Sequence, residues 1–352
     1  MAEQNFRQKD LYERQPVAPG WYVVAQSETL RRKPTELTFN SVPLVAFRDT
    51  AGRPAILLDR CPHRNAPLSK GRVQGDRLQC HYHGWEFDGS GTCRAVPGLC
   101  APAEHSSRRV PRYVCREQQG WLWMYSEPAV EPPAPPPPIP CADDPSYLTI
   151  RQHVSMPGPV HAVAENALDV PHTAFVHAGL FRGPHRRSPI EVVIRSDGNQ
   201  VEAQYIGEQR PKGLVGRLLA PRGGDVTHFD RFILPCLAQV EYRIGADSHI
   251  LTTAALTPRE PNLTDLFATV AVRTPLPDLL LRHLVKPVAM HIVRQDVDVL
   301  RQQTEQVERF GAEQFVSTEI DVLGLRIQKL LRDAAQGKTP RPVEERHITM
   351  LV

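Results

Sequence analysis

The chain has 352 residues, a length that predicts two domains. Hydrophobic residues make up 41% and charged residues 23%, as in a globular protein with a sizeable core, and the net charge of +3 argues against a nucleic-acid binder. No apolar run approaches the ~18 to 20 residues that span a bilayer, and the polar N-terminus lacks the apolar stretch of a secretory signal. We therefore expect a cytoplasmic protein with no membrane span and no nucleic-acid partner.

Short β-rich runs follow one another from residue 20 to about residue 127. Turn-forming sequences at 49–54 and 88–92 separate these runs and indicate hairpins. Residues 20–127 are therefore predicted to form a small all-β domain. Two of the seven cysteines lie in a motif of this domain, and the other five show no paired spacing, which favours free thiols in a reducing cytoplasm.

Within this domain, two short loops each offer one cysteine and one histidine. Cys61-x-His63 is followed, after 16 intervening residues, by Cys80-x-x-His83. Two thiolates and two imidazoles suit either a tetrahedral zinc ion or a two-iron two-sulfur cluster in which histidines replace cysteines on one iron. The mixed arms favour the cluster, because a structural zinc finger more often keeps its cysteines in one arm and its histidines in the other.

The segment from Cys61 to Trp85 closely resembles the Rieske domain signature over its full length. Respiratory-chain Rieske domains carry two further cysteines that form a disulfide, and this chain has Ala66 and Tyr82 at those positions. The resemblance is therefore to the ferredoxin and oxygenase kind, with a potential toward the low end of the roughly −150 to +300 mV range of Rieske centres. It implies that a 2Fe-2S cluster is bound by four residues: Cys61, His63, Cys80 and His83.

A proline-rich stretch follows the β domain. More than half of residues 127–140 are proline, which disfavours a helix or a central strand and predicts a stiff linker at 128–145. Residues 146–340 open with a strand and a helix-like segment from Pro159, continue with hairpin-spaced β runs, and end with helix patterns at about 279–310 and 320–331. This order predicts an α+β domain in which a curved antiparallel sheet wraps around helices.

The helix-like segment after Pro159 carries a second candidate site. On a continuous helix, Glu165, Asp169 and His172 fall on one face, and Asn166 borders that face. His172 and His177 are five residues apart, so they converge on one metal only if the helix ends or bends between them. Pro171 is expected to kink or restart this helix.

The long C-terminal helix offers the carboxylate that completes a site for non-haem Fe(II) with two imidazoles. Asp296 lies on the apolar stripe of that helix, seven residues after Ala289. A buried acid is costly unless a cation or a proton compensates it, whereas Asp298 faces elsewhere and is expected to be solvated. We therefore predict Asp296 as the third ligand beside His172 and His177.

The order of these features resembles the catalytic (alpha) subunit of the Rieske non-haem iron oxygenases, from about residue 20 to about residue 300. The resemblance implies a C-terminal helix-grip, START-like domain in which His172, His177 and Asp296 bind a mononuclear Fe(II). It also implies that Asp169 connects His172 to the partner subunit's His83 in a homotrimer.

Two further residues, Asn166 and Glu165, match catalytic positions near the iron in that family. Electrons are expected from NADH or NADPH through a separate reductase or ferredoxin, because the chain has no GxGxxG after a strand and no flavin or plant-type ferredoxin motif. The chain length resembles the homotrimeric, monooxygenase-like branch. We therefore expect an O2-dependent monooxygenase that hydroxylates a C–H bond of a bulky cyclic organic substrate, as in secondary metabolism.

Other functions stay open at this stage. Within the family, the alternatives are oxidative O- or N-demethylation and aromatic-ring dioxygenation. Outside it, they are a Rieske electron-transfer protein with a binding domain and a zinc-stabilised binding module. The basic stretch at 181–188 is interpreted as a surface loop or as an entrance loop for an anionic group, and Phe232, Leu234 and Ile292 are predicted to line the pocket.

Overall fold

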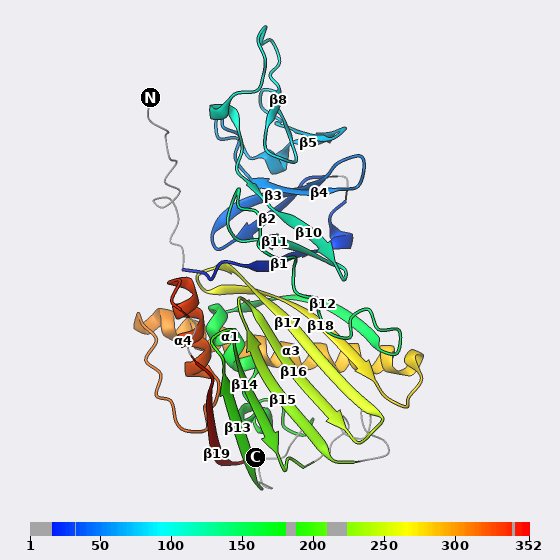
Figure 1. The fold of residues 1–352 in the computed structure, drawn as a ribbon, viewed down its shortest axis with the longest axis vertical. Coiled ribbons are helices and arrows are strands. Elements are labelled where there is room, and N and C mark those ends of the chain that lie inside the picture. Colours follow the sequence, from blue (N-terminus) through cyan, green and yellow to red (C-terminus); the bar gives the residue numbers. More distant parts are fainter. Residues whose placement is uncertain (1–15, 32, 181–187, 210–223, 340–341) are drawn as a thin grey trace. The chain divides into compact units, whose positions relative to one another are not determined.

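The structure is a computed structural model that describes residues 16–31, 33–180, 188–209, 224–339 and 342–352. The chain divides into two compact units, one made mainly of residues 20–136 and the other of residues 137–257 and 262–352 (Figure 1). The predicted boundaries at 20–127, 128–145 and 146–340 stay a prediction. Of the basic stretch at 181–188, residues 181–187 lie outside the described residues.

The described part of the first unit is built from short strands with a few 3-10 turns, as predicted. Its three small sheets have the strand orders β1-β11-β10, β2-β3-β4-β9 and β5-β6-β7-β8. Trp121 and Trp123 of β11 are fully buried. The strands are β1 (Trp21–Gln26), β2 (Thr35–Phe39), β3 (Val42–Arg48), β4 (Pro54–Leu58), β5 (Arg72–Gln74), β6 (Arg77–Gln79), β7 (Glu86–Asp88), β8 (Cys93–Ala95), β9 (Arg112–Tyr113), β10 (Cys115–Gln118) and β11 (Trp121–Tyr125).

The described part of the second unit contains one sheet of eight strands, in the order β12-β18-β17-β16-β15-β14-β13-β19. Strands that follow one another in sequence pair as antiparallel neighbours through β13, β14, β15, β16 and β17. The strands are β12 (Leu148–Pro157), β13 (Pro189–Ser196), β14 (Gln200–Ile206), β15 (Val226–Ile233), β16 (Leu237–Ile244), β17 (Ser248–Glu260), β18 (Leu263–Arg273) and β19 (Glu344–Leu351).

Helices cover one face of this sheet. The long helix α3 (Asp278–Phe310) packs along β12, while α1 (Val160–Ala167) packs between α3 and α4 (Gly324–Ala335) (Figure 1). The main hydrophobic core lies between sheet and helices, where Val163 of α1, Phe232 of β15 and Ile327 of α4 are fully buried. The predicted α+β class with a long C-terminal helix is confirmed. Among the helices that the structure describes, none has the length and apolarity that crossing a membrane requires.

The helix predicted from Pro159 ends earlier than the kink or restart expected at Pro171. Helix α1 ends at Ala167, because Leu168 takes non-helical angles with φ −116° and ψ 12°. The chain restarts at Pro171 as the 3-10 helix η5 (Pro171–Ala174), as expected for a proline at the first helical turn. Asp169 therefore lies in the break between two helical pieces.

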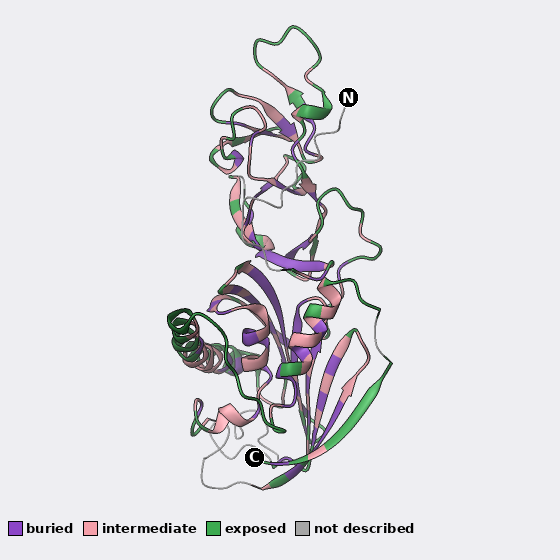
Figure 2. Cartoon of the chain, turned by 90° about the vertical axis from the view of Figure 1, so that its left-hand side faces the viewer, coloured by how far each residue is buried: buried purple, intermediate pink, exposed green. Residues whose placement is uncertain are grey.

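The edge strand β19 was missed from the sequence. It pairs with β13 in an antiparallel register that joins Pro189 to Leu351, and most of it is exposed (Figure 2). Charged residues are depleted in strands, and this segment begins with Glu344, Glu345 and Arg346. Its extended structure is fixed by pairing with a strand about 150 residues earlier.

Candidate functional site

The two loops of the first unit share one backbone geometry. In the first loop, the Cys61 N–H donates to the carbonyl of Ala66, and the carbonyl of Cys61 accepts from the N–H of Asn65, both at 2.9 Å. The second loop repeats this pattern, because Cys80 N–H donates to Trp85 O at 2.8 Å and Cys80 O accepts from Gly84 N–H at 3.1 Å. The fourth residue after each cysteine is left-handed, with φ 59° at Asn65 and 69° at Gly84. Two equal turns thus present one cysteine and one histidine each.

The donor side chains of the two loops lie near one another. The imidazoles of His63 and His83 lie edge to face with centroids 4.5 Å apart, and the His63 ring stacks on Trp85 at 4.7 Å. Both thiols are buried, whereas His83 is exposed. The cluster site is therefore insulated on its sulfur side and open on its histidine side.

Two observations test whether this site fits a metal group. The Nδ1 atom of His63 is buried and has no hydrogen-bond partner in the described part of the chain, as expected of an atom that binds metal. Burial, followed by the neighbouring Cys80 thiol, raises the pKa of Cys61 to about 12, so the Cys61 sulfur needs a bound cation to become a thiolate. The donor set fits a 2Fe-2S cluster with two sulfur and two nitrogen ligands.

The zinc alternative is disfavoured by the spacing of the same donors. A tetrahedral zinc ion binds N and S ligands at about 2.0 to 2.3 Å, which brings the four donors to roughly 3 to 4 Å of one another. Among the described residues, the one group of three or more donors that lie within 4.8 Å of one another is His172, His177 and Asp296. The cysteine and histidine loops do not converge in this way, as a larger two-iron cluster requires.

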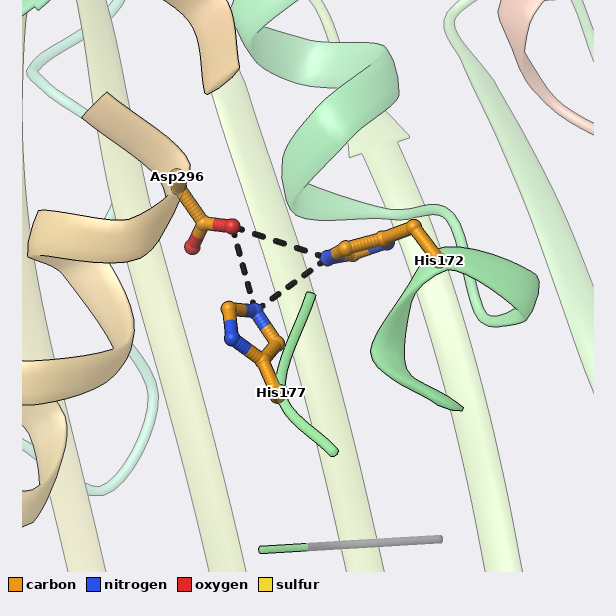
Figure 3. Close-up of side chains that lie close together, drawn as sticks. All are labelled: His172, His177 and Asp296. Carbon is orange, nitrogen blue, oxygen red and sulfur yellow. Dashed lines mark hydrogen bonds and ion pairs between the residues drawn. The ribbon is translucent and has the colours of Figure 1, made fainter. Parts of the chain in front are cut away.

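The second unit brings its three predicted metal ligands together (Figure 3). The Nε2 atoms of His172 and His177 are 3.3 Å apart, and Asp296 Oδ1 lies 3.6 Å from the former and 3.1 Å from the latter. Two ligands at about 2.1 Å from one ion and at right angles are ~3 Å apart, so this triangle fits a single metal ion. Two imidazoles and one carboxylate are the donors of non-haem Fe(II) sites with open positions.

Local backbone geometry explains why two histidines five residues apart can meet. His172 belongs to η5, which ends at Ala174, and His177 lies in the turn that follows. The Nδ1 atom of His172 lies 2.5 Å from the backbone carbonyl of Asp169, so this nitrogen carries a proton and Nε2 keeps its lone pair. The Asp169 carboxylate also accepts the backbone N–H of His172 at 3.0 Å, which holds the 3-10 turn in place.

Charges around the triangle favour a cation. Burial opposes the charged imidazole, but Asp169 and Asp296 outweigh it and raise the pKa of His172 to about 9. Burial likewise opposes the Asp296 carboxylate, and His172 and His177 hold its pKa below the usual value. Asp296 Oδ1 is buried, and no described residue donates a hydrogen bond of good geometry to it. Without a metal the site takes up a proton, and a divalent ion satisfies the same atoms.

The triangle opens on a cavity of about 290 Å³ between the sheet and helices α1 and α3. Its walls are mostly apolar, with Ala289, Ile292 and Val293 of α3 facing Ala238 and Val240 of β16. Cavities of this size that are apolar with a few polar groups typically bind small organic molecules. The metal triangle therefore lies on the wall of a substrate-sized pocket.

The predicted residues around the metal divide into two groups. Asn166 and Asp169 line the cavity, as do the three predicted metal ligands. Glu165 does not line the cavity. Its side chain packs on Gly324 of α4 so closely that a Cβ atom added to Gly324 would lie 2.1 Å from Glu165 Oε1. Because α1 ends before Asp169, Glu165 no longer shares a face with Asp169 and His172. Its catalytic role stays a prediction.

The prediction of pocket-lining residues is correct for the helix and incorrect for the strands. Ile292 lines the cavity, whereas the expectation for Phe232 and Leu234 is wrong, because Phe232 is buried in the core and neither residue reaches the cavity. The Asp298 side chain is 63% exposed and pairs with Arg301 at 2.9 Å, as expected of a solvated residue.

Three polar residues of the site had no role in the sequence analysis. Gln295 accepts a hydrogen bond from His177 Nδ1 at 2.9 Å, and His228 and Asp230 line the cavity from β15. Its position next to Asp296 is the feature of the sequence from which a role for Gln295 could have been predicted. His228 and Asp230 alternate along a strand and so share one face, but periodicity does not tell which face is inside.

Comparison with known proteins agrees with this geometry. Residues 20–113 match the Rieske [2Fe-2S] domain, and residues 156–337, more than half of the chain, match the vanillate O-demethylase oxygenase C-terminal domain. The oxygenase component of dicamba O-demethylase from Stenotrophomonas maltophilia is 38% identical over 206 residues, which are 58% of this chain and 60% of that protein. The 4beta-methylsterol monooxygenase of Methylococcus capsulatus is 33% identical over 202 residues, 53% of this chain and 50% of that protein. The matches thus span little more than half the length of these relatives.

Solved structures resemble the chain over most of its length. Dicamba monooxygenase bound to 3,6-dichlorosalicylic acid has a TM-score of 0.78 and 25% identity, covering 92% of this chain and 98% of that one. Dicamba monooxygenase with non-heme iron and dicamba has a TM-score of 0.69 and 27% identity, covering 90% and 96%. The Rieske domain, the metal triangle and these similarities lead to one assignment. The chain belongs to the catalytic subunits of the Rieske oxygenases, in the group with a vanillate O-demethylase-type C-terminal domain.

Proposed function

We propose that this chain is the terminal component of a monooxygenase that hydroxylates a C–H bond of a cyclic, largely apolar molecule. The observation that carries the proposal is the triangle of His172, His177 and Asp296 on the wall of the 290 Å³ cavity. Family membership supports it, since the chain also contains a Rieske domain. The net reaction consumes one O2, two electrons and two protons, inserts one oxygen atom into the C–H bond and releases one water.

In this proposal, Cys61, His63, Cys80 and His83 bind the 2Fe-2S cluster, and His172, His177 and Asp296 bind one Fe(II). When bound, the iron supplies O2 activation and the cluster supplies electrons one at a time. The chain's own residues orient and insulate these groups. The carbonyl of Asp169 and the amide of Gln295 each hold one imidazole by Nδ1, which turns both Nε2 atoms to the same point.

Asp169 is proposed to link the two kinds of metal centre. Its carboxylate accepts from the backbone of His172 and lies 3.2 Å from His172 Nδ1. His83 is exposed at the open side of the cluster site, so it can reach an acceptor on another chain. We propose that the carboxylate of Asp169 contacts His83 of the partner subunit in a homotrimer.

The electrons are proposed to come from NADH or NADPH through a separate reductase, with or without a ferredoxin. Four basic residues near the cluster loops are proposed to attract an acidic redox partner: Arg64, Lys70, Arg72 and Arg77. The proposed location is a reducing cytoplasm, which suits a chain whose seven cysteines form no disulfide.

Oxidative O- or N-demethylation is a second candidate, favoured by the match to the vanillate O-demethylase oxygenase domain and by the similarity to dicamba O-demethylase. The two candidates share their first step. Hydroxylation of a methyl group on oxygen or nitrogen gives an unstable product that releases formaldehyde. The position of the methyl group in the cavity then decides between a stable alcohol and loss of the methyl carbon.

The test is substrate-dependent O2 uptake with a generic NADH-dependent reductase, over a panel of steroids, methoxyarenes and polycyclic metabolites. The expected result is uptake with a hydroxylated product, or with formaldehyde and the demethylated product, found by mass spectrometry. The matched control is Asp296→Ala beside Asp298→Ala, because only the first removes a member of the metal triangle.

Two results would contradict the proposal. Iron analysis that finds only the two irons of the cluster, unchanged in a His172→Ala variant, would favour an electron-transfer protein. A colourless protein without Rieske absorption would favour the zinc-stabilised module.

A further inference from the structure

We propose that the carboxylate of Asp230 is the polar anchor of the substrate cavity, and that it selects neutral or cationic substrates carrying an O–H or N–H donor and rejects carboxylates. This inference rests on the proposed function and deepens it by naming the substrate class. It arises from a buried cluster on the sheet, made of His228, Asp230 and Glu208, which we call the β15 acid–imidazole cluster.

The register of the sheet places this cluster on the cavity side. His228 and Asp230 are two residues apart on β15, so both side chains point to one face. Their cross-strand partners on β16 are Tyr242 and Val240, and both of these residues also line the cavity. The same face holds the apolar wall opposite α3. Asp230 is therefore a charged group within an otherwise largely apolar surface.

Aromatic rings fix the imidazole of the cluster. The His228 ring stacks between Tyr205 of β14 at 4.5 Å and Tyr242 of β16 at 3.9 Å, with interplanar angles of 23° and 18°. These rings are direct cross-strand neighbours, because Tyr205 pairs with His228 and His228 pairs with Tyr242. The imidazole cannot rotate without breaking both stacks, so its two nitrogens have fixed directions.

Both nitrogens of His228 are already used. Nδ1 lies 2.7 Å from Glu208 Oε2, and Nε2 lies 3.0 Å from Asp230 Oδ1. All three residues are buried, with His228 1%, Asp230 2% and Glu208 7% exposed. Buried carboxylates on both sides favour the imidazolium, which then donates to both. The imidazole thus offers no donor to a substrate, and the polar group left to face the cavity is a carboxylate.

The charge of the cluster determines which substrates fit. One imidazolium between two carboxylates leaves a net charge of −1 at the cavity wall. Among the described residues that line the cavity there is no lysine and no arginine, and its histidines are His228 and the two metal ligands. At the β15 side of the cavity, away from the proposed iron, a substrate carboxylate would meet negative charge without a partner, whereas a hydroxyl or ammonium group finds an acceptor.

The experiment measures binding of four compounds of similar shape: 4-methoxybenzyl alcohol, 4-methoxybenzylamine, 4-methoxytoluene and 4-methoxybenzoate. Isothermal titration calorimetry uses the full chain as purified with its metals, without reductase, so no turnover is needed. We expect the alcohol and the amine to bind roughly 10- to 100-fold more tightly than the toluene, since a hydrogen bond to a charged group contributes this much. The benzoate should bind most weakly.

Two variants separate recognition from folding. Asp230→Asn keeps the shape and removes the charge, so the preference for the alcohol and the amine should shrink to a few-fold, and the benzoate should gain. Glu208→Gln removes the same charge on the other side of His228, and the Glu208 side chain does not line the cavity. In this variant the alcohol should therefore still bind more tightly than the toluene.

The proposal is overturned if the benzoate binds best, if all four compounds bind equally or not at all, or if Asp230→Asn leaves the order unchanged. If Glu208→Gln lost the preference for the alcohol and the amine as fully as Asp230→Asn, the cluster would act only by stabilising the fold. Failure of the proposed function would be seen separately, as a lack of O2 uptake in a protein that still binds the alcohol.

Discussion

Nδ1 of His177 lies 2.9 Å from Oε1 of Gln295, although the two residues are 118 positions apart in the chain. The amide oxygen can only accept, so it places the imidazole proton on Nδ1 and turns the Nε2 lone pair toward His172 and Asp296. Helix α3 therefore supplies both the proposed ligand Asp296 and, one residue earlier, the group that orients the proposed ligand His177.

Replacing Gln295 should weaken metal binding without removing a ligand. Gln295→Leu takes away the acceptor, so His177 can adopt the wrong tautomer, and affinity for the mononuclear iron should fall by about 10- to 100-fold. Gln295→Glu keeps an acceptor and should retain the iron. Iron per chain after dialysis against a weak chelator checks this, with the cluster absorption as internal control. Equal iron in Gln295→Leu and the parent protein would contradict it.

Asp296 and Asp298 form a matched pair for testing the third ligand. Asp296 lies in the metal triangle, whereas Asp298 is solvated and pairs with Arg301. Asp296→Asn should abolish retention of the mononuclear iron, because a neutral amide cannot compensate the charge of the ion at a buried site. Asp298→Asn should leave metal content and activity within error. Loss of iron in both variants, or in neither, would count against the assignment.

Cys80 and Cys93 allow a similar comparison in the first unit. Both thiols are buried in the same core, but only Cys80 lies in a cluster loop. Cys80→Ala should remove the visible absorption of the Rieske cluster and two irons per chain, whereas Cys93→Ala should keep both and lose at most about 1 kcal/mol of stability. A protein that stays coloured after Cys80→Ala would show that this cysteine is not a ligand.

The β15 acid–imidazole cluster should make stability depend on pH. Burial opposes the charge on His228, but Asp230 and Glu208 outweigh it and raise the pKa of His228 to about 9, above the unfolded value of 6.5. A raised pKa stabilises the fold fully below about pH 6.5, and this contribution of about 3 kcal/mol is lost as pH rises through 9.

Chemical denaturation at pH 6.5 and pH 9.5 measures this effect. Asp230→Asn removes one of the two carboxylates, so the free energy of unfolding should fall less between the two pH values than it does in the parent protein. The same pH-dependent fall in both proteins would mean that other groups cause it.

The sequence by itself was enough to predict the donor residues of both proposed metal centres. The spacing of Cys61, His63, Cys80 and His83 is local, and a local turn repeated twice is enough to present the four donors. The order of β runs and the long helix pattern gave the α+β class, because hydrophobic periodicity reports directly on elements that bury one face. Asp296 was recognisable as an acid on an apolar stripe, whose burial requires a compensating cation.

Only the tertiary structure decided how distant segments combine. Glu165 lies on the side of α1 that packs against α4 and not on the cavity wall, which follows from how the helices pack together. Gln295 reaches His177, and His228 reaches Glu208 and two tyrosine rings, across contacts that no local pattern encodes. Strand alternation shows which residues share a face but not which face is inside. That His228 and Asp230 face the cavity is therefore decided by the register of the eight-stranded sheet.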